Sequence, residues 1–281
     1  MDYELTIEPH RGWMRIPWRE ILEYRDLLFL LVRRDFLSQY KQTVLGPLWF
    51  VIQPLITTIV FTVVFGKVAK IPTDGLPPML FYLCGTMAWG YFSGCLGQTS
   101  SIFLSNVGIF GKVYFPRLII PLSAILSRLI AFGVQLGTFL VFLLYFKFLT
   151  PAGATIHPGL SILLVPLLLL QSAALGMGVG LWISALTTRY RDFGFLSGFM
   201  TQLWMYATPV VYPLSVVPEQ WRWAVSLNPM AVTVEAYRKA FFGVGTLDWP
   251  SVVAAVSITV LLLISGVAVF GRAERTFIDT V

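Results

Sequence analysis

Residues Arg33–Pro54 read RRDFLSQYKQTVLGPLWFVIQP and change from charged and polar to largely apolar within one short stretch. The change comes at Leu45-Gly46-Pro47, where a glycine followed by a proline is typical of a turn. Such an abrupt change is expected where a chain leaves a membrane surface and enters the hydrocarbon core. Because the apolar environment recurs downstream, this stretch predicts the cytoplasmic start of the first span of a multi-span membrane protein.

The composition of the whole chain agrees with this interpretation. The 281 residues are 57% apolar and 12% charged, whereas a soluble domain carries about 25% charged residues. About 20 apolar residues cross a bilayer, and six stretches qualify, at about 44–65, 79–100, 118–148, 160–186, 193–211 and 251–270. We therefore expect an all-α integral membrane protein, with six transmembrane helices in a domain over 44–271, a cytoplasmic N-terminal segment over 1–43 and a cytoplasmic tail over 272–281.

The segment before the first span, Trp18–Tyr40, sorts its side chains into a charged face and an apolar face at helical spacing. An amphipathic helix next to a span is expected to lie in the membrane interface, with its apolar face against the acyl chains. A core-facing helix of a small soluble domain is the alternative. The immediate junction with a span favours the interface helix.

The distribution of Lys and Arg predicts the orientation of the chain. With the N-terminus inside the cell, the inner segments hold 13 of these residues and the outer segments hold six, while Arg128 lies within the third span. Cytoplasmic loops carry the excess of positive charge. Together with an even number of spans, this places both termini in the cytoplasm.

The segment between the second and third spans, Ser101–Arg117, is neither apolar enough to span nor polar enough to be a free loop. A short amphipathic helix ended by Pro116 would present apolar side chains to a groove on a cytosolic partner. A helix lying passively at the interface is the equal alternative. The candidate docking residues are Asn106, Ile109, Phe110, Lys112, Tyr114, Phe115 and Arg117.

The outer segment Tyr212–Phe242 has two apolar stretches on either side of Asn228-Pro229, each too short to cross a membrane. Backbone polar groups at membrane depth must be hydrogen-bonded, which favours a helix, a break and a returning helix that dip into the membrane. The alternative is a loop on the outer surface, anchored by Trp221 and Trp223.

Aromatic residues make up 15% of the chain. Rings stack on sugar faces and their polar atoms bond hydroxyls, so they suit a path for a sugar chain, although packing and lipid-facing belts explain most membrane aromatics. The candidates in or near the first, second and fifth spans are Trp49, Tyr82, Trp89, Tyr91, Phe92, Trp204, Tyr206 and Tyr212.

The sequence lacks the common motifs of catalysis and of phosphate binding. Gly108 and Gly111-Lys112 are too close together for a phosphate-binding loop, and His10 and His157 are the only histidines, so no metal cluster is expected. Arg128 is the charge within a span, and Glu235 is its candidate partner. With few acidic groups at membrane depth, uphill transport would need energy from another chain.

Five ordered motifs resemble those of the permease subunits of type-2 ABC exporters, and they cover nearly the whole chain. They are Arg34-Asp35-Phe36 with Tyr40-Lys41 and Leu45-Gly46-Pro47-Leu48-Trp49; Lys112-Val113-Tyr114-Phe115-Pro116-Arg117 with Pro121-Leu122-Ser123; Tyr190-Arg191-Asp192; Thr208-Pro209-Val210-Val211-Tyr212-Pro213; and Leu227-Asn228-Pro229-Met230 with Arg238. The subgroup is the one that exports lipid-linked polysaccharides of O-antigen, teichoic acid or capsule type. Thr208 stands where serine is expected and keeps the hydroxyl.

The resemblance implies a homodimer of this chain in a bacterial cytoplasmic membrane, with two copies of a separate ATP-binding subunit. The chain itself would then be no enzyme and would hold no cofactor, since ATP and Mg would bind the partner subunit; no nucleic acid is expected. Ser101–Arg117 would be the coupling helix, and Tyr212–Phe242 the gate helices. The implied gate and interface residues are Arg34, Asp35, Arg191, Asp192, Asn228, Pro229 and Arg238.

Two other functions stay open at this point. A type-2 ABC exporter of drugs or other small amphiphiles would share the motifs, and a membrane scaffold without transport would share the hydropathy pattern. The interface helix and the abundance of aromatic residues favour the polysaccharide exporter.

Overall fold

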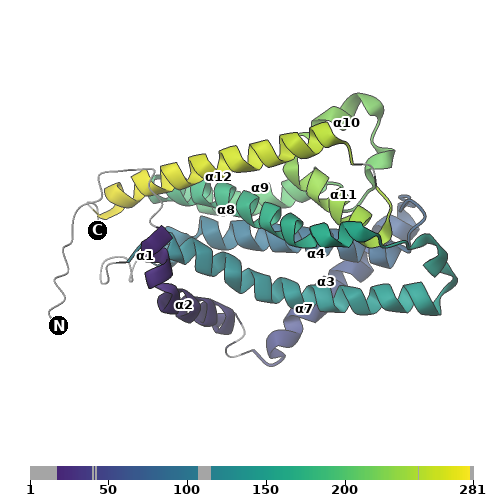
Figure 1. The fold of residues 1–281 in the computed structure, drawn as a ribbon, viewed down its shortest axis with the longest axis horizontal. Coiled ribbons are helices and arrows are strands. Elements are labelled where there is room, and N and C mark those ends of the chain that lie inside the picture. Colours follow the sequence, from purple (N-terminus) through teal and green to yellow (C-terminus); the bar gives the residue numbers. More distant parts are fainter. Residues whose placement is uncertain (1–17, 40, 42, 107–114, 246, 279–281) are drawn as a thin grey trace.

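The computed structural model describes residues 18–39, 41, 43–106, 115–245 and 247–278, and over these ranges its regular elements are helices, with no strand. Long helices lie roughly side by side in an elongated bundle (Figure 1). The elements are α1 Trp18–Glu23, α2 Arg25–Ser38, α3 Trp49–Phe61, α4 Pro78–Ser100, α5 Ile102–Ser105, α7 Ile119–Leu149, α8 Val165–Arg189, α9 Asp192–Tyr206, α10 Glu219–Ser226, α11 Pro229–Phe242 and α12 Trp249–Ile278. The all-α class predicted from the sequence is confirmed.

Four helical stretches of the described chain are long and apolar enough to cross a membrane: Gly46–Val68, Ile119–Leu149, Leu160–Arg189 and Trp249–Ala273. These correspond to the first, third, fourth and sixth predicted spans. The second, α4, has 23 residues but is less apolar. The fifth, α9, has 15 residues, or about 22 Å at 1.5 Å per residue. Four spans are therefore supported, and six remain a prediction.

The turn at the start of the first span is built as its sequence predicts. Gly46 has a φ of 51°, a backbone conformation that glycine adopts without strain. The 3₁₀ turn Gly46–Leu48 leads directly into α3, and a π-helical turn over Thr62–Val68 completes this stretch.

The N-terminal segment forms two helices rather than the single helix predicted over Trp18–Tyr40. The break comes at Tyr24, whose backbone angles (φ −90°, ψ 21°) are not helical, and Tyr40 lies outside the described residues. Ile21 and Leu31 are buried in a cluster with residues of α7, α8 and α12. Part of the apolar face of this segment therefore packs on the bundle, while other large apolar side chains of α1 and α2 stay exposed. Their position against the acyl chains of a membrane interface stays a prediction.

The glycines of the fourth predicted span allow α8 to lie very close to α4 and α12. A Cβ on Gly180 would lie 2.6 Å from Cβ of Thr99 in α4, and a Cβ on Gly178 would lie 2.7 Å from the backbone nitrogen of Leu263 in α12. Close contact through small residues is typical of membrane helices. The small residues of α8 thus form a contact surface towards both neighbouring helices.

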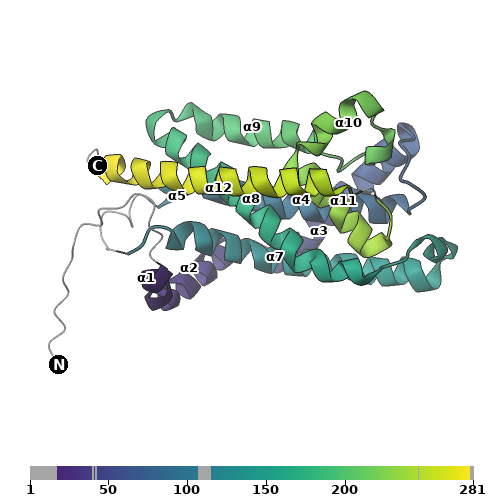
Figure 2. The same cartoon turned by 45° about the horizontal axis from the view of Figure 1, so that its top comes forward.

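The two ends of the bundle differ in what they carry. α1, the end of α12 and the connection between α8 and α9 lie at one end, while α10 and the connection between α7 and α8 lie at the other (Figures 1 and 2). The start of α1 and the end of α12 thus share one end, as an even number of crossings requires.

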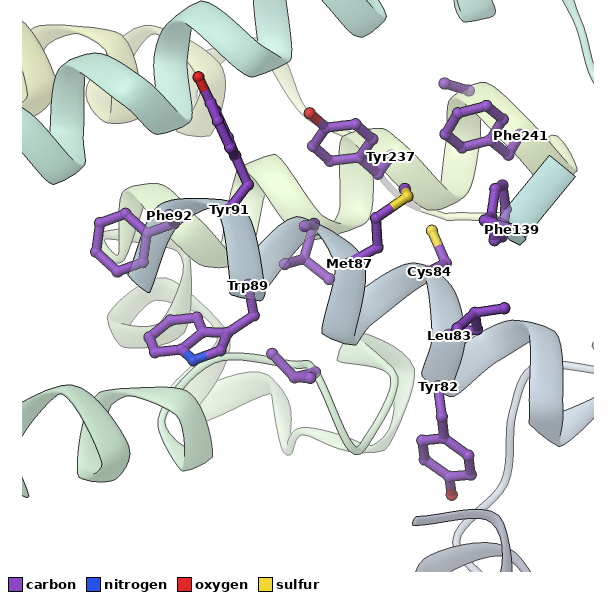
Figure 3. Packing of buried hydrophobic residues seen from close by; sticks show 14 of the residues in the cluster. Tyr82, Leu83, Cys84, Met87, Trp89, Tyr91, Phe92, Phe139, Tyr237 and Phe241 are labelled. Atoms are coloured by element: carbon purple, nitrogen blue, oxygen red, sulfur yellow. The ribbon is translucent and has the colours of Figure 1, made fainter. Parts of the chain in front are cut away.

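The main hydrophobic core is built around α4, whose side chains are mostly buried. Figure 3 shows Tyr82 and Trp89 on one side of α4 and Tyr91 on the other. Tyr237 and Phe241 of α11 and Phe139 of α7 complete the cluster, with Phe139 and Phe241 at a ring distance of 4.8 Å. α11, predicted as an outer gate helix, is therefore an integral part of the core.

Candidate functional site

A cavity of about 400 Å³ lies between α3, α4 and α7, with Met205 of α9 at its edge. Its polar groups come from all three helices, whereas much of the rest of its wall is aromatic or aliphatic. A largely apolar pocket with a few convergent polar groups is typical of a ligand site. The lining residues are Trp49, Phe50, Gln53, Pro54, Thr57, Thr86, Trp89, Gly90, Tyr91, Ser93, Gly94, Arg128, Ala131, Phe132, Gln135 and Met205.

The structure brings three of the eight candidate path aromatics to this cavity: Trp49, Trp89 and Tyr91. Trp204 lies beside it, because its ring is 6.4 Å from Trp89 and 5.0 Å from Phe92. The rings of Trp89, Phe92 and Trp204 form one contiguous aromatic cluster that extends from α4 to α9.

The remaining candidate aromatics are spread over other parts of the chain. Tyr82 is fully buried and packs against Phe61 and Phe81. Tyr212 is partly buried against the main core, while the side chain of Tyr206 is exposed at the end of α9. The eight residues therefore do not line one continuous surface of the single chain.

Asn228 joins the end of α9 to the start of α11. Its Oδ1 caps α11 by accepting from the backbone N–H of Met230 (3.1 Å) and also accepts from Nε1 of Trp204 (3.0 Å). Its Nδ2 donates to the hydroxyl of Thr208 (2.9 Å). Pro229 takes the first helical position, where no backbone donor is needed. The break predicted at Asn228-Pro229 is thus present, and the hydroxyl of Thr208 is used.

Replacing Asn228 with alanine is expected to lower the stability of the folded chain by about 1–2 kcal/mol, the usual cost of losing a helix cap. Asn228→Asp keeps the acceptor for Trp204 and Met230 but loses the donor to Thr208, so a smaller loss is expected. Thermal unfolding in detergent measures both variants. Equal midpoints for Asn228→Ala and the wild type would show that the cap does not hold α11.

Glu235 and Arg238 form a buried ion pair within α11, with an Nη1–Oε1 distance of 2.7 Å. Nη2 of Arg238 also donates to the carbonyl of Val210 (3.0 Å), and the guanidinium lies 3.7 Å from the centre of the Phe81 ring. Glu235, the candidate partner of Arg128, pairs with Arg238 instead, because the i, i+3 spacing on one helix brings these two side chains together. Arg238 thereby connects α11 to Phe81 of α4 and to Val210 in the segment after α9.

Arg128 extends from α7 into the cavity. A Cβ on Gly94 would lie 3.0 Å from its Cδ, so the side chain runs directly over the backbone of α4. Its Nε is buried and has no hydrogen-bond partner among the described residues. The position of Arg128 within a span was predicted from the sequence. Its contact with a glycine of α4 was not, because that contact depends on how α4 and α7 pack.

Arg34 and Asp35 connect the N-terminal helices to the predicted docking segment. Arg34 donates to Oδ1 of Asp35 (2.7 Å from Nη2) and to Oδ1 of Asn106 (3.2 Å). The hydroxyl of Ser123 in α7 donates to the other oxygen of Asp35 (3.4 Å). This polar network links α2, α7 and the residue that follows α5.

The rest of the predicted docking segment is only partly described. Ile109, Phe110, Lys112 and Tyr114 lie outside the described residues. Phe115 is buried in the cluster that contains Phe103 and Phe270, and Arg117 is partly buried just before α7. Phe103 stacks on Phe270 at 4.7 Å. These phenylalanines pack inside the chain and do not project from it.

Arg191 and Asp192 lie at the connection between α8 and α9, and both are exposed. Arg191 caps α9 through its backbone and Asp192 is the first residue of that helix. A carboxylate in the first turn is favourable for the helix dipole. These two residues are separated in the chain from the Arg34 network and from the Glu235–Arg238 pair.

The family match and the similar proteins of known description point to the same kind of protein. The family described as ABC-2 type transporter matches residues 26–242. The chain is 26% identical to the O-antigen export system permease protein RfbA of Klebsiella pneumoniae, over 90% of this chain and 94% of that protein. It is also 26% identical to the RfbA protein of the same description from Myxococcus xanthus, over 94% of this chain and 98% of the relative. The capsule polysaccharide export inner-membrane protein CtrC of Neisseria meningitidis serogroup A is 22% identical, over 91% and 94%. With the family match covering more than half of its length, the chain belongs to the ABC-2 type transporter family.

Proposed function

We propose that this chain is the permease subunit of an ATP-driven exporter that moves lipid-linked polysaccharide, of O-antigen, teichoic acid or capsule type, across the inner membrane of a bacterium. The observation that carries the proposal is the similarity along nine-tenths of the chain to permeases named for O-antigen and capsule polysaccharide export. The four apolar helices support a multi-pass membrane protein. In this proposal six helices cross the membrane and both termini face the cytoplasm.

The energy would come from two copies of a separate ATP-binding subunit, which would hold ATP and Mg, while two copies of this chain would form the path. The dimer is supported by α9, none of whose residues is buried in the single chain. Apolar side chains on α9 face outward, as do several on α3. We propose that the second copy covers part of these faces, and that they border the path and its lateral opening.

Movement of the ATP-binding subunits would reach the path through the segment 101–117. The contact of Arg34 with Asn106, and of Ser123 with Asp35, supports this route, because both bonds join that segment or α7 to the N-terminal helices. A pull on the docking segment would therefore move α2 and α7 together. Phe110→Glu is expected to uncouple ATP hydrolysis from export if this segment docks on the partner.

The aromatic cluster beside the cavity would provide weak stacking contacts along which a glycan moves. Because each contact is worth little, no single one holds the chain in place. Replacing Trp49, Trp89 or Trp204 singly with alanine is expected to reduce export several-fold, as measured by the surface glycan in a strain that carries the variant. Tyr145→Ala, an exposed aromatic on α7 outside the cavity, is the control. Unchanged export in all three tryptophan variants would contradict this path.

The proposed substrate is tested in a strain that lacks the chain. Lipid-linked polysaccharide is expected to accumulate inside the cell, with loss of the glycan from the surface. The wild-type chain should restore the surface glycan. A normal surface glycan in the deletion strain, with dye efflux lost instead, would favour the export of small amphiphiles.

A further inference from the structure

Arg128 is a charged residue within α7, one of the helices apolar enough to span a membrane. It is the tenth residue of α7, about 14 Å along a helix whose hydrocarbon environment is about 30 Å thick. The carboxylate of Glu235 is engaged with Arg238, and Nε of Arg128 has no hydrogen-bond partner within the described ranges. Charged side chains at such depth are costly and generally serve a function.

Two glycines of α4, one helical turn apart, make room for polar side chains of α7. A Cβ on Gly94 would lie 3.3 Å from Nε of Arg128, and a Cβ on Gly90 would lie 3.6 Å from Oε1 of Gln135. Gln135 follows Arg128 by two turns and so lies on the same face of α7. The helix pair is thus shaped to hold a guanidinium and an amide against the backbone of α4, at the wall of the cavity.

The cavity carries a positive charge that its own wall does not neutralise. Arg128 is charged, and none of the other lining residues is an aspartate or a glutamate. The other polar residues of the lining include Gln53 and Gln135 with their amides, the hydroxyl-bearing Thr57, Thr86, Ser93 and Tyr91, and the indoles of Trp49 and Trp89. Such a wall favours an anion that also carries hydrogen-bonding groups, because the amides bond hydroxyls while the guanidinium bonds the charge.

We propose that this cavity binds an oxyanion of the exported amphiphile, a phosphate or a carboxylate, and that Arg128 holds it. A planar guanidinium matches the geometry of both groups and forms two parallel hydrogen bonds with either. The inference rests on the proposed function, because it assigns the anion to the exported glycolipid. The neighbouring rings of Trp49 and Trp89 would then contact the first sugars.

Binding is tested on the complex of this chain with its ATP-binding subunit in maltoside micelles. Dodecyl phosphate is titrated while tryptophan fluorescence is recorded, since Trp49 and Trp89 line the cavity. Octaethylene glycol dodecyl ether is the neutral probe. Arg128→Gln is expected to weaken binding of dodecyl phosphate by at least about tenfold, the loss of one charged hydrogen-bonding group, and to leave binding of the neutral probe unchanged. Arg25→Gln, an exposed arginine of α2, should bind both probes as the wild type does.

Arg128→Lys is a second variant that tests the site if Arg128→Gln does not assemble. Lysine retains the positive charge but cannot form the two parallel hydrogen bonds of a guanidinium. An intermediate affinity is expected for it. Equal affinity of the wild type and both variants for dodecyl phosphate would overturn the proposal. So would displacement of dodecyl phosphate by phosphatidylglycerol at equal concentration, since the site would then hold a bulk membrane lipid.

Export separates this inference from the proposed function. A strain carrying Arg128→Gln is expected to accumulate glycan inside the cell, although the variant complex still hydrolyses ATP. Normal export by Arg128→Gln would overturn the anion site and leave the polysaccharide function standing. No accumulation in a strain without the chain would instead overturn the proposed function itself.

Discussion

Replacing Gly178 with leucine is expected to prevent α8 and α12 from packing and to abolish assembly of the transporter. A Cβ at this position would lie 2.7 Å from the backbone nitrogen of Leu263 and 2.9 Å from the carbonyl oxygen of Leu262. The facing residue, Gly266, is equally close, since its Cβ would lie 2.5 Å from the carbonyl oxygen of Gly178. Backbone atoms cannot move aside as a flexible side chain does, so the cost should exceed the usual 1–3 kcal/mol or so of overpacking.

The expected result is loss of the monodisperse complex on size-exclusion chromatography in detergent, and loss of export. Gly133→Leu is the matched control, because Gly133 lies in α7 and a Cβ there would meet nothing within 4 Å. It makes the same change of residue type in a predicted span. A Gly178→Leu chain that assembles and exports as the control does would contradict the contact between α8 and α12.

Replacing Arg238 with methionine is the second change with a large expected effect. Arg238 and Glu235 have side-chain exposures of 3% and 4%, and the substitution leaves the Glu235 carboxylate buried without its partner. Breaking one side of such a pair costs about 3–5 kcal/mol. The variant also loses the bond to the carbonyl of Val210 and the contact with the Phe81 ring. A large drop in the thermal midpoint in detergent is expected.

The double variant Arg238→Met with Glu235→Leu separates the ion pair from the shape of α11. Replacing both partners of a buried pair by apolar residues is often neutral for stability, so most of the lost midpoint should return. Export should stay impaired if the bond to Val210 positions the segment between α9 and α11. A double variant as unstable as Arg238→Met would show that the contacts with Val210 and Phe81 carry the effect.

Much of the fold could be predicted from hydropathy, and the differences between the predicted and the observed helices have physical causes. The predicted third span differs by one residue at each end from α7, because long apolar runs set these limits. The break at Tyr24 was not predicted, since the apolar periodicity continues through it. Phe103 lies in the predicted docking segment and is buried on Phe270, a contact between distant parts of the chain that local periodicity does not reveal.

In the candidate site, too, local features could be predicted from the sequence, whereas contacts between distant parts of the chain could not. The i, i+3 spacing of Glu235 and Arg238 is visible in the sequence and would have predicted their ion pair. The acceptor role of the Val210 carbonyl depends on the tertiary position of the segment after α9, and no local pattern predicts it. Asn228-Pro229 was recognised as a break from its residue types alone, whereas the bond from Trp204 to Asn228 required the two helices to meet.

The central claim is ATP-driven export of lipid-linked polysaccharide, and transport in inside-out membrane vesicles tests it most directly. Vesicles that contain this chain and its proposed ATP-binding subunit would be prepared with lipid-linked glycan exposed on their outer face. Addition of ATP is expected to protect the glycan from an added glycan hydrolase, only when both subunits are present. ATP hydrolysis by an intact complex that leaves the glycan fully sensitive to the hydrolase would contradict the account.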